Sequence, residues 1–166
     1  LYGLNCMNIN IFSGCEFHDV GKPCKFCSVK SAVRRDDPVE IIKTPEELSE
    51  VCELATKYDD FNYIIITGGS HLNTDEEFDK HIEIIKAIKN KLPWNGRIKG
   101  NVAMMPPKTK SKLKELYDNG VENPSFNMEV WPKNNFEKIC PGKEKYVGFD
   151  YVVESLLYLK DIYGPG

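Results

Sequence analysis

Three cysteines near the start of the chain constrain it more than any other feature. Cys15, Cys24 and Cys27 lie within thirteen residues, and the last two form a Cys-x-x-Cys pair. In such a pair the backbone can curl so that both thiolates face one metal centre. Cys15 needs a loop to return to that centre, and the Gly-Lys-Pro segment at residues 21–23 supplies turn residues for it. Because three protein thiolates leave a coordination position open, the spacing predicts a metal centre at which chemistry occurs.

The cysteines allow two other interpretations. Cys6 can complete a four-thiolate zinc site with Cys15, Cys24 and Cys27, which would make the chain a non-enzymatic zinc-binding module. A disulfide framework is less favoured, since six cysteines in 166 residues without a secretory signal segment suit a reducing compartment. We therefore expect a cytoplasmic protein and keep the zinc module as the alternative hypothesis.

Composition excludes two classes of partner. A hydrophobic content of 41% in 166 residues favours one globular domain with a buried core. The formal net charge of -3 gives no basic surface for a nucleic acid. No apolar run is as long as a membrane span. We therefore expect neither a nucleic acid nor a membrane as a partner.

Strand-like and helix-like segments alternate along the chain. The expected strands cover residues 4–12, 61–67, 97–104 and 125–130. Four helices are expected. The first begins at residue 45, and the others cover residues 74–92, 111–119 and 149–163. Gly120 closes the helix at residues 111–119. This alternation is typical of βα units that curl into a barrel with the site on the loops after the strands. The predicted fold is α/β, a partial TIM-like barrel with four βα units.

Two of these helices have clear signals. At the first, Thr44 is the predicted N-cap, Pro45 takes the first helical position and Glu47 completes a capping box. Its expected buried stripe is Leu48, Val51, Cys52 and Ala55. The expected inward stripe of the next helix is Phe78, Ile82, Ile85, Ile88 and Leu92.

The expected strand at residues 61–67 ends in Gly68-Gly69-Ser70. Its continuous apolar run is typical of a parallel strand that is buried on both faces. Paired glycines at the carboxyl end of such a strand let a ligand approach the backbone closely. His71 follows this turn and is a minor site candidate, whereas His81 lies beside an apolar stripe and is expected to be a structural residue.

In their order along the chain, these features resemble the radical S-adenosylmethionine (SAM) enzymes. Cys24-Lys-Phe26-Cys27 is similar to the Cys-x-aromatic-Cys that ends the family's cluster loop. The eight residues between Cys15 and Cys24 exceed the usual spacing of the family. The resemblance implies that the three cysteines hold a [4Fe-4S] cluster and that Phe26 packs on the adenine or the cluster. It also implies that Gly68-Gly69-Ser70 contacts the amino group of SAM, with Ser70 in place of the family's Glu.

A second resemblance lies in the expected fourth strand and the residues that follow it. Asn127-Met-Glu129-Val130, then Lys138 and Pro141-Gly142, is similar to lipoyl synthase and its biotin-synthase-like relatives. It implies that the Glu129 carboxylate reaches the ribose hydroxyls or the methionine end of SAM, and a carboxylate can accept hydrogen bonds from two adjacent hydroxyls. Lys138 is the weaker candidate, for the SAM carboxylate.

The resemblance also implies a reaction and its partners. An electron from the cluster cleaves SAM to methionine and a 5′-deoxyadenosyl radical, which abstracts hydrogen from a substrate. The expected substrate is a small molecule or cofactor precursor, and the expected electron donor is a protein such as ferredoxin or flavodoxin.

Four βα units do not close a barrel. We expect residues 1–166 to form the N-terminal part of a radical SAM core domain, with the missing barrel segment supplied by further polypeptide or by a partner. The fourth strand would otherwise expose an unpaired edge.

Overall fold

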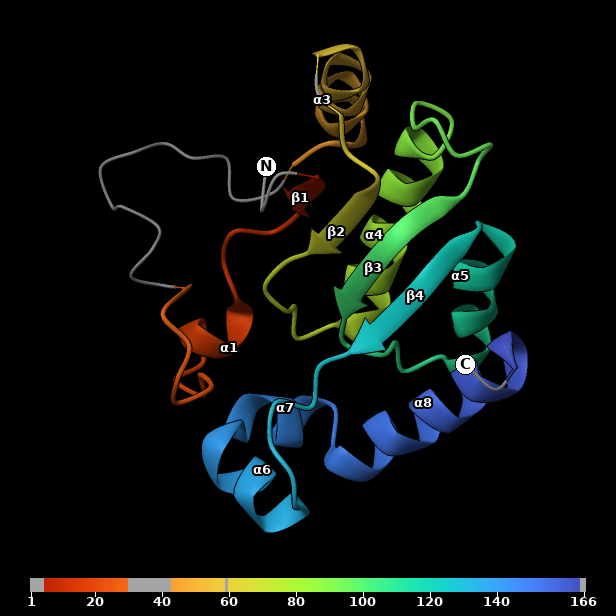
Figure 1. Ribbon diagram of the computed structural model, residues 1–166. Helices are drawn as coiled ribbons and strands as arrows, with labels where there is room; N and C mark the ends of the chain where they lie inside the picture. The colour runs from red at the N-terminus through yellow and green to blue at the C-terminus, as the bar shows by residue number, and fades with distance from the viewer. Residues whose placement is uncertain (1–4, 30–42, 59, 165–166) are drawn as a thin grey trace.

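The computed structural model contains one sheet of four parallel strands in the order β1-β2-β3-β4 (Figure 1). The structure describes residues 5–29, 43–58 and 60–164. The strands are β1 (Cys6–Asn10), β2 (Tyr63–Thr67), β3 (Ile98–Met104) and β4 (Val121–Phe126). Consecutive strands are neighbours in the sheet and are joined through helical segments, as in a βα barrel. The predicted α/β class and the partial TIM-like barrel are confirmed.

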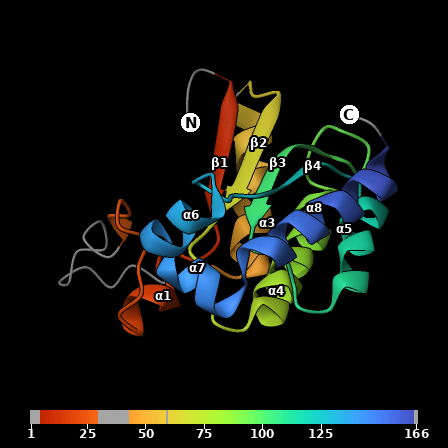
Figure 2. The same ribbon diagram turned by 90° about the horizontal axis from the view of Figure 1, so that it is seen from below.

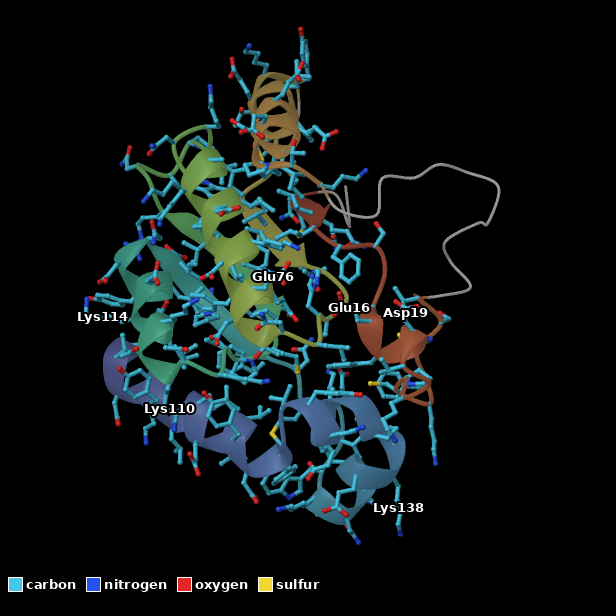
Figure 3. All side chains as sticks on the ribbon, turned by 180° about the vertical axis from the view of Figure 1, so that it is seen from behind. Glu16, Asp19, Glu76, Lys110, Lys114 and Lys138 are labelled. Atoms are coloured by element: carbon cyan, nitrogen blue, oxygen red, sulfur yellow. The ribbon has the colours of Figure 1, made fainter. Side chains whose placement is uncertain are left out.

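Most of the helices lie on one side of this sheet. The larger helical segments are α3 (Pro45–Tyr58), α4 (Thr74–Ile88), η1 (Lys110–Leu113) with α5 (Lys114–Asp118), and α8 (Phe149–Tyr163). Figure 3 shows α4 and α5 over the back of the sheet, and in Figure 1 none of the described helices lies in front of it. None of the described helices is both long and apolar enough to cross a lipid bilayer.

Three short helices gather beyond the carboxyl ends of the strands. They are α1 (Glu16–Asp19), α6 (Lys133–Ile139) and α7 (Pro141–Tyr146). Figure 1 and Figure 2 both show them on the side to which the strand arrowheads point. They therefore surround the edge of the sheet at which a βα barrel carries its site.

Packing against α4 buries one face of the sheet. Ile64 and Ile66 are fully buried, and the whole predicted stripe is buried: Phe78, Ile82, Ile85 and Ile88 on α4, and Leu92 just after it. The alternate residues of β2, Tyr63 and Ile65, are only partly buried. The expectation that β2 is buried on both faces is therefore wrong, because no described helix covers the second face.

The predicted start of α3 is confirmed. The Thr44 backbone N–H donates to Glu47 Oε2 at 2.8 Å, and the Glu47 N–H donates to Thr44 Oγ1 at 3.2 Å. This reciprocal pair satisfies two backbone donors that the helix cannot satisfy itself. Leu48 and Cys52 are buried as expected, but Val51 is 48% exposed, since it lies one position to the side of the buried stripe.

The other helix boundaries differ in detail. The second predicted helix ends at Ile88 rather than at residue 92. The third is divided into η1 and α5, and Gly120 follows it with a φ of +76°, as a C-terminal cap requires. The last helix, α8, has the predicted bounds.

The fourth strand lies earlier than predicted. β4 spans Val121–Phe126, and the predicted strand at residues 125–130 is mostly a loop in which Glu129 has a φ of +66°. Pro124 argues against a strand in the sequence, because proline cannot donate to a ladder. It is tolerated here because β4 is at the edge of the described sheet and pairs with β3 alone. What covers this edge stays a prediction.

Candidate cofactor-binding site

A cavity of about 280 Å³ opens at the carboxyl ends of the strands. Asn10, Thr67 and Met104, the last residues of β1, β2 and β3, lie in its wall. Apart from Lys138 and the minor candidate His71, every predicted site residue also lines it: Cys15, Cys24, Phe26, Cys27, Gly68, Gly69, Ser70 and Glu129. The structure thus brings together residues that are more than a hundred positions apart in the sequence.

The cysteine loop is shaped by its own backbone hydrogen bonds. Cys15 has extended backbone geometry and caps α1, and the Cys27 N–H donates to the Cys24 carbonyl at 3.0 Å. Gly21 has a φ of +68°, a conformation that glycine adopts without strain, so the predicted turn is present. All three cysteines are half-buried free thiols.

The Gly-Gly turn after β2 is packed directly against this loop. A Cβ on Gly69 would lie 1.6 Å from the Gly14 carbonyl oxygen, so only glycine fits there. The Gly69 N–H donates to the Phe12 carbonyl at 2.8 Å, and the Ser70 carbonyl accepts from the Glu16 N–H at 2.9 Å. The close approach at Gly69 is therefore to the cysteine loop, which sets the position of the loop relative to β2.

Glu129 forms an ion pair that the sequence did not predict. Lys143 Nζ lies 2.9 Å from Glu129 Oε1 and donates to the Asn127 carbonyl at 2.7 Å. Lys143 is 8% exposed and lines the cavity. The preceding Gly142 explains how α7 comes so close, since a Cβ there would lie 2.4 Å from the Lys22 carbonyl oxygen. The only sequence signal for Lys143 was its position directly after Pro141-Gly142.

Lys138 is not at the site, and its prediction is corrected. It is an exposed residue on α6 and does not line the cavity. Figure 3 shows it at the outer side of the molecule. The sequence prediction placed it wrongly because α6 and α7 are separate helices, and the turn between them at Cys140 directs Lys143 to the cavity instead.

Phe26 lies at the mouth of the cavity with 58% of its surface exposed. It also lines a shallower depression with Lys25, Val130 and Ile139. An aromatic ring in this position offers an apolar face to a ligand that occupies the cavity.

His71 and His81 are parts of the scaffold. His71 is buried, stacks on Phe12 with ring centroids 4.4 Å apart, and has Nδ1 3.2 Å from Glu16 Oε1. It does not line the cavity, so its minor candidacy is not supported. His81 is buried as well, and burial lowers its pKa to about 4.

Comparison with known proteins identifies the family. The model of the radical SAM superfamily matches residues 9–165, nearly the whole chain. The chain belongs to the radical SAM superfamily.

One curated relative of this radical SAM chain is Bacteriochlorophyllide c C-7(1)-hydroxylase from Chlorobaculum limnaeum. It is 23% identical over 177 residues, which cover 96% of this chain and 43% of the relative. The chain therefore spans less than half the length of the relative. Neither comparison concerns the lipoyl synthase and biotin synthase branch, which stays a prediction.

The donor set of this radical SAM chain, three free thiols around one cavity, fits the ligands that an iron–sulfur cluster uses. Among residues 5–29, 43–58 and 60–164, no three His, Cys, Asp or Glu side chains converge on a point where one metal ion could bind. A zinc ion needs all of its thiolates about 2.3 Å away, whereas a [4Fe-4S] cluster binds them on separate irons. Three free thiols around one cavity suit the second arrangement.

Cys6 is separated from that cavity. It begins β1, whereas Asn10 at the other end of the strand lines the cavity. Four strand positions correspond to about 13 Å. The structure therefore gives no support to a zinc site that uses Cys6 as its fourth ligand.

Cys24 has the most unusual environment of the three thiols. Burial raises its pKa to about 12, and nearby Lys143 acts in the opposite direction. Its neighbour Cys140 is buried, which raises the pKa of that thiol too. Because a metal ligand must be a thiolate, binding at Cys24 would release a proton.

Proposed function

We propose that Cys15, Cys24 and Cys27 hold a [4Fe-4S] cluster and that SAM binds in the adjoining cavity. One observation carries the proposal: the three thiols share a single cavity with the Gly-Gly turn after β2 and with the Glu129–Lys143 pair. When bound, the cluster supplies the electron that cleaves SAM to a 5′-deoxyadenosyl radical for hydrogen abstraction.

The protein residues bind and orient SAM in this proposal. Gly68-Gly69-Ser70 meets its amino group through the backbone, and the Glu129 carboxylate accepts hydrogen bonds from the ribose hydroxyls or meets the methionine end.

Lys143 takes the role first assigned to Lys138. Its ammonium group has three donors. In the part of the chain that the structure describes, Glu129 and the Asn127 carbonyl accept from two of them, and we assign the third to the SAM carboxylate. Phe26 covers the adenine at the mouth.

We infer a small-molecule or cofactor-precursor substrate. The name of the Chlorobaculum limnaeum relative gives a bacteriochlorophyllide as its substrate and hydroxylation as its reaction. A role in cofactor or small-molecule biosynthesis, with ferredoxin or flavodoxin as the electron donor, agrees with that name. The proposed reaction of this chain begins with removal of a substrate hydrogen.

Anaerobic reconstitution tests the cluster proposal. The wild-type protein is expected to be brown and to bind about four irons per chain, as one [4Fe-4S] cluster requires. Cys15→Ala, Cys24→Ala and Cys27→Ala should each lose most of this iron. Cys6→Ala is the matched control and should retain it.

The zinc-module alternative makes the opposite prediction. A colourless protein with one tightly bound zinc per chain, lost when Cys6 is changed, would overturn the cluster proposal.

A further inference from the structure

Glu77 is a glutamate in the interior of the protein. It lies near the start of α4, and only 2% of it is exposed. Its two oxygens accept from two different loops. Oε2 accepts from the His71 N–H at 2.9 Å, and Oε1 accepts from the Met105 N–H at 3.0 Å. One carboxylate therefore joins the segment after β2 to the segment after β3.

Both of these segments form the wall of the cavity. Ser70, which precedes His71, lines it, and Met105 lines it directly. The two amides that Glu77 binds are thus at the cavity wall or one residue away from it. The spacing between these segments sets the width of the cavity on the side of β2 and β3.

A second carboxylate holds the same turn from the other side. Glu16 on α1 accepts from the Leu72 N–H at 2.6 Å and lies beside His71 Nδ1. Figure 3 labels Glu16 on α1 and Glu76, the exposed neighbour of Glu77, on α4. Glu16 ties the turn to the cysteine loop, so Glu77 is the contact that extends this connection to β3.

We propose that Glu77 is a positioning residue for SAM: its ionised carboxylate holds the β2 and β3 segments at the spacing that the cofactor requires. This inference rests on the proposed SAM site and adds to it a residue that touches neither SAM nor the cluster.

The environment of Glu77 gives this role a pH dependence. Burial raises its pKa from the ordinary 4.5 to about 7, although the two backbone hydrogen bonds lower it. Once Glu77 is protonated, one of its oxygens carries an O–H donor and becomes a weaker acceptor for the backbone N–H that it faces. The charged and titratable groups around it are His71, Glu16, His81 and Lys143, all of which remain in a Glu77 variant.

Stability and SAM affinity should therefore move in opposite directions with pH. The folded protein keeps the Glu77 proton up to about pH 7, whereas the unfolded chain releases it near 4.5. The contribution of Glu77 to the free energy of unfolding thus falls as the pH rises between these values. SAM affinity should instead rise towards pH 7 and above, as Glu77 ionises. A residue with a purely structural role would not produce this opposition.

The test is the SAM dissociation constant of the cluster-reconstituted protein, by calorimetry. Glu77→Gln replaces one acceptor with an NH₂ donor that faces a backbone N–H, and should weaken SAM binding about tenfold at pH 8, the loss of roughly one hydrogen bond to a charged group. The iron content should stay unchanged. Glu76→Gln is the matched control, because Glu76 is exposed and forms an ion pair with Lys80 on its own helix. It should bind SAM as the wild type does.

The outcomes are distinguishable. If Glu77→Gln binds SAM as tightly as Glu76→Gln, or if wild-type affinity does not fall below pH 7, the inference on Glu77 is overturned while the SAM site stands. If the wild type with its cluster binds no SAM, the proposed function fails, and this inference fails with it.

A second measurement needs no variant and decides the matter if Glu77→Gln does not fold. Amide hydrogen exchange of the wild type reports on the His71 and Met105 N–H groups directly. Their protection factors should fall together as the pH drops below 7, and SAM should raise both. Protection of either amide that is independent of both pH and SAM would contradict the proposal.

Discussion

The packed face of the sheet and the cavity at its carboxyl end are stabilised in different ways. Behind the sheet, Phe78 and the isoleucines of α4 are fully buried against Ile64 and Ile66. At the cavity, single polar or steric contacts join segments from different elements: Gly69 against Gly14, Lys143 with Glu129, and Glu77 with two loops.

This difference determines how each region responds to change. In the core many contacts share the stabilisation, so a substitution lowers stability and leaves geometry largely intact. In the cavity one contact sets the relative position of two segments, so its loss should alter binding more than stability. Substitutions in the two regions should therefore affect different measurements.

The largest expected effect on stability is in the core. Phe78→Ala removes a fully buried ring from α4 and should lower the free energy of unfolding by about 3–5 kcal/mol. The iron bound per folded chain should not change. Chemical denaturation and iron analysis measure the two quantities. Leu157→Ala, at a 57% exposed position of α8, is the control and should be within about 0.5 kcal/mol of the wild type. Loss of iron from folded Phe78→Ala would remove the distinction between the regions.

Gly69→Ala should show the reverse pattern. Its Cβ would overlap the Gly14 carbonyl, so the cysteine loop must move. We expect a stability loss of about 1–3 kcal/mol, typical of overpacking, together with loss of most of the iron. Gly68→Ala is the milder comparison, because its Cβ would lie 3.1 Å from the Phe12 nitrogen. Full iron content in Gly69→Ala would show that the contact does not position the cysteines.

Lys143→Met should have the smallest effect on stability and a specific effect on SAM. It removes the ammonium group that holds Glu129 and the Asn127 carbonyl while keeping a long apolar stem. We expect a stability loss of about 1 kcal/mol and about tenfold weaker SAM binding, since hydrogen bonds of a charged group are lost. Lys145→Met, at an exposed position of the same helix, should bind SAM normally. Equal SAM affinity of the two variants would exclude Lys143 from the site.

The packed face was largely predictable from the sequence because its signals are local. Apolar periodicity gave the stripe of α4, and the Thr44–Glu47 capping box gave the start of α3. Local signals gave a wrong prediction where tertiary context determines the structure. Pro124 argued against a strand at β4, but proline is tolerated there because β4 lies at the edge of the described sheet.

The cavity was predictable only in part. The cysteines and the Gly-Gly turn are visible as sequence motifs, and the structure places them together. Lys143 and Glu77 are not, since a lysine after Pro-Gly and one glutamate within Asp75-Glu76-Glu77 have no distinctive pattern. Lys143 contacts Glu129, which is 14 positions away, and Glu77 contacts Met105, which is 28 positions away. No sequence periodicity encodes such contacts.

The most direct test of the central claim is electron paramagnetic resonance of the reduced, reconstituted protein with and without SAM. If the three thiolates hold a cluster with an open iron beside the cavity, the wild type should give a signal of a reduced [4Fe-4S] cluster, and SAM should change that signal. Cys27→Ala should give neither the signal nor the change. A cluster signal that is unaffected by saturating SAM would contradict the account, as would a wild-type protein that takes up no cluster.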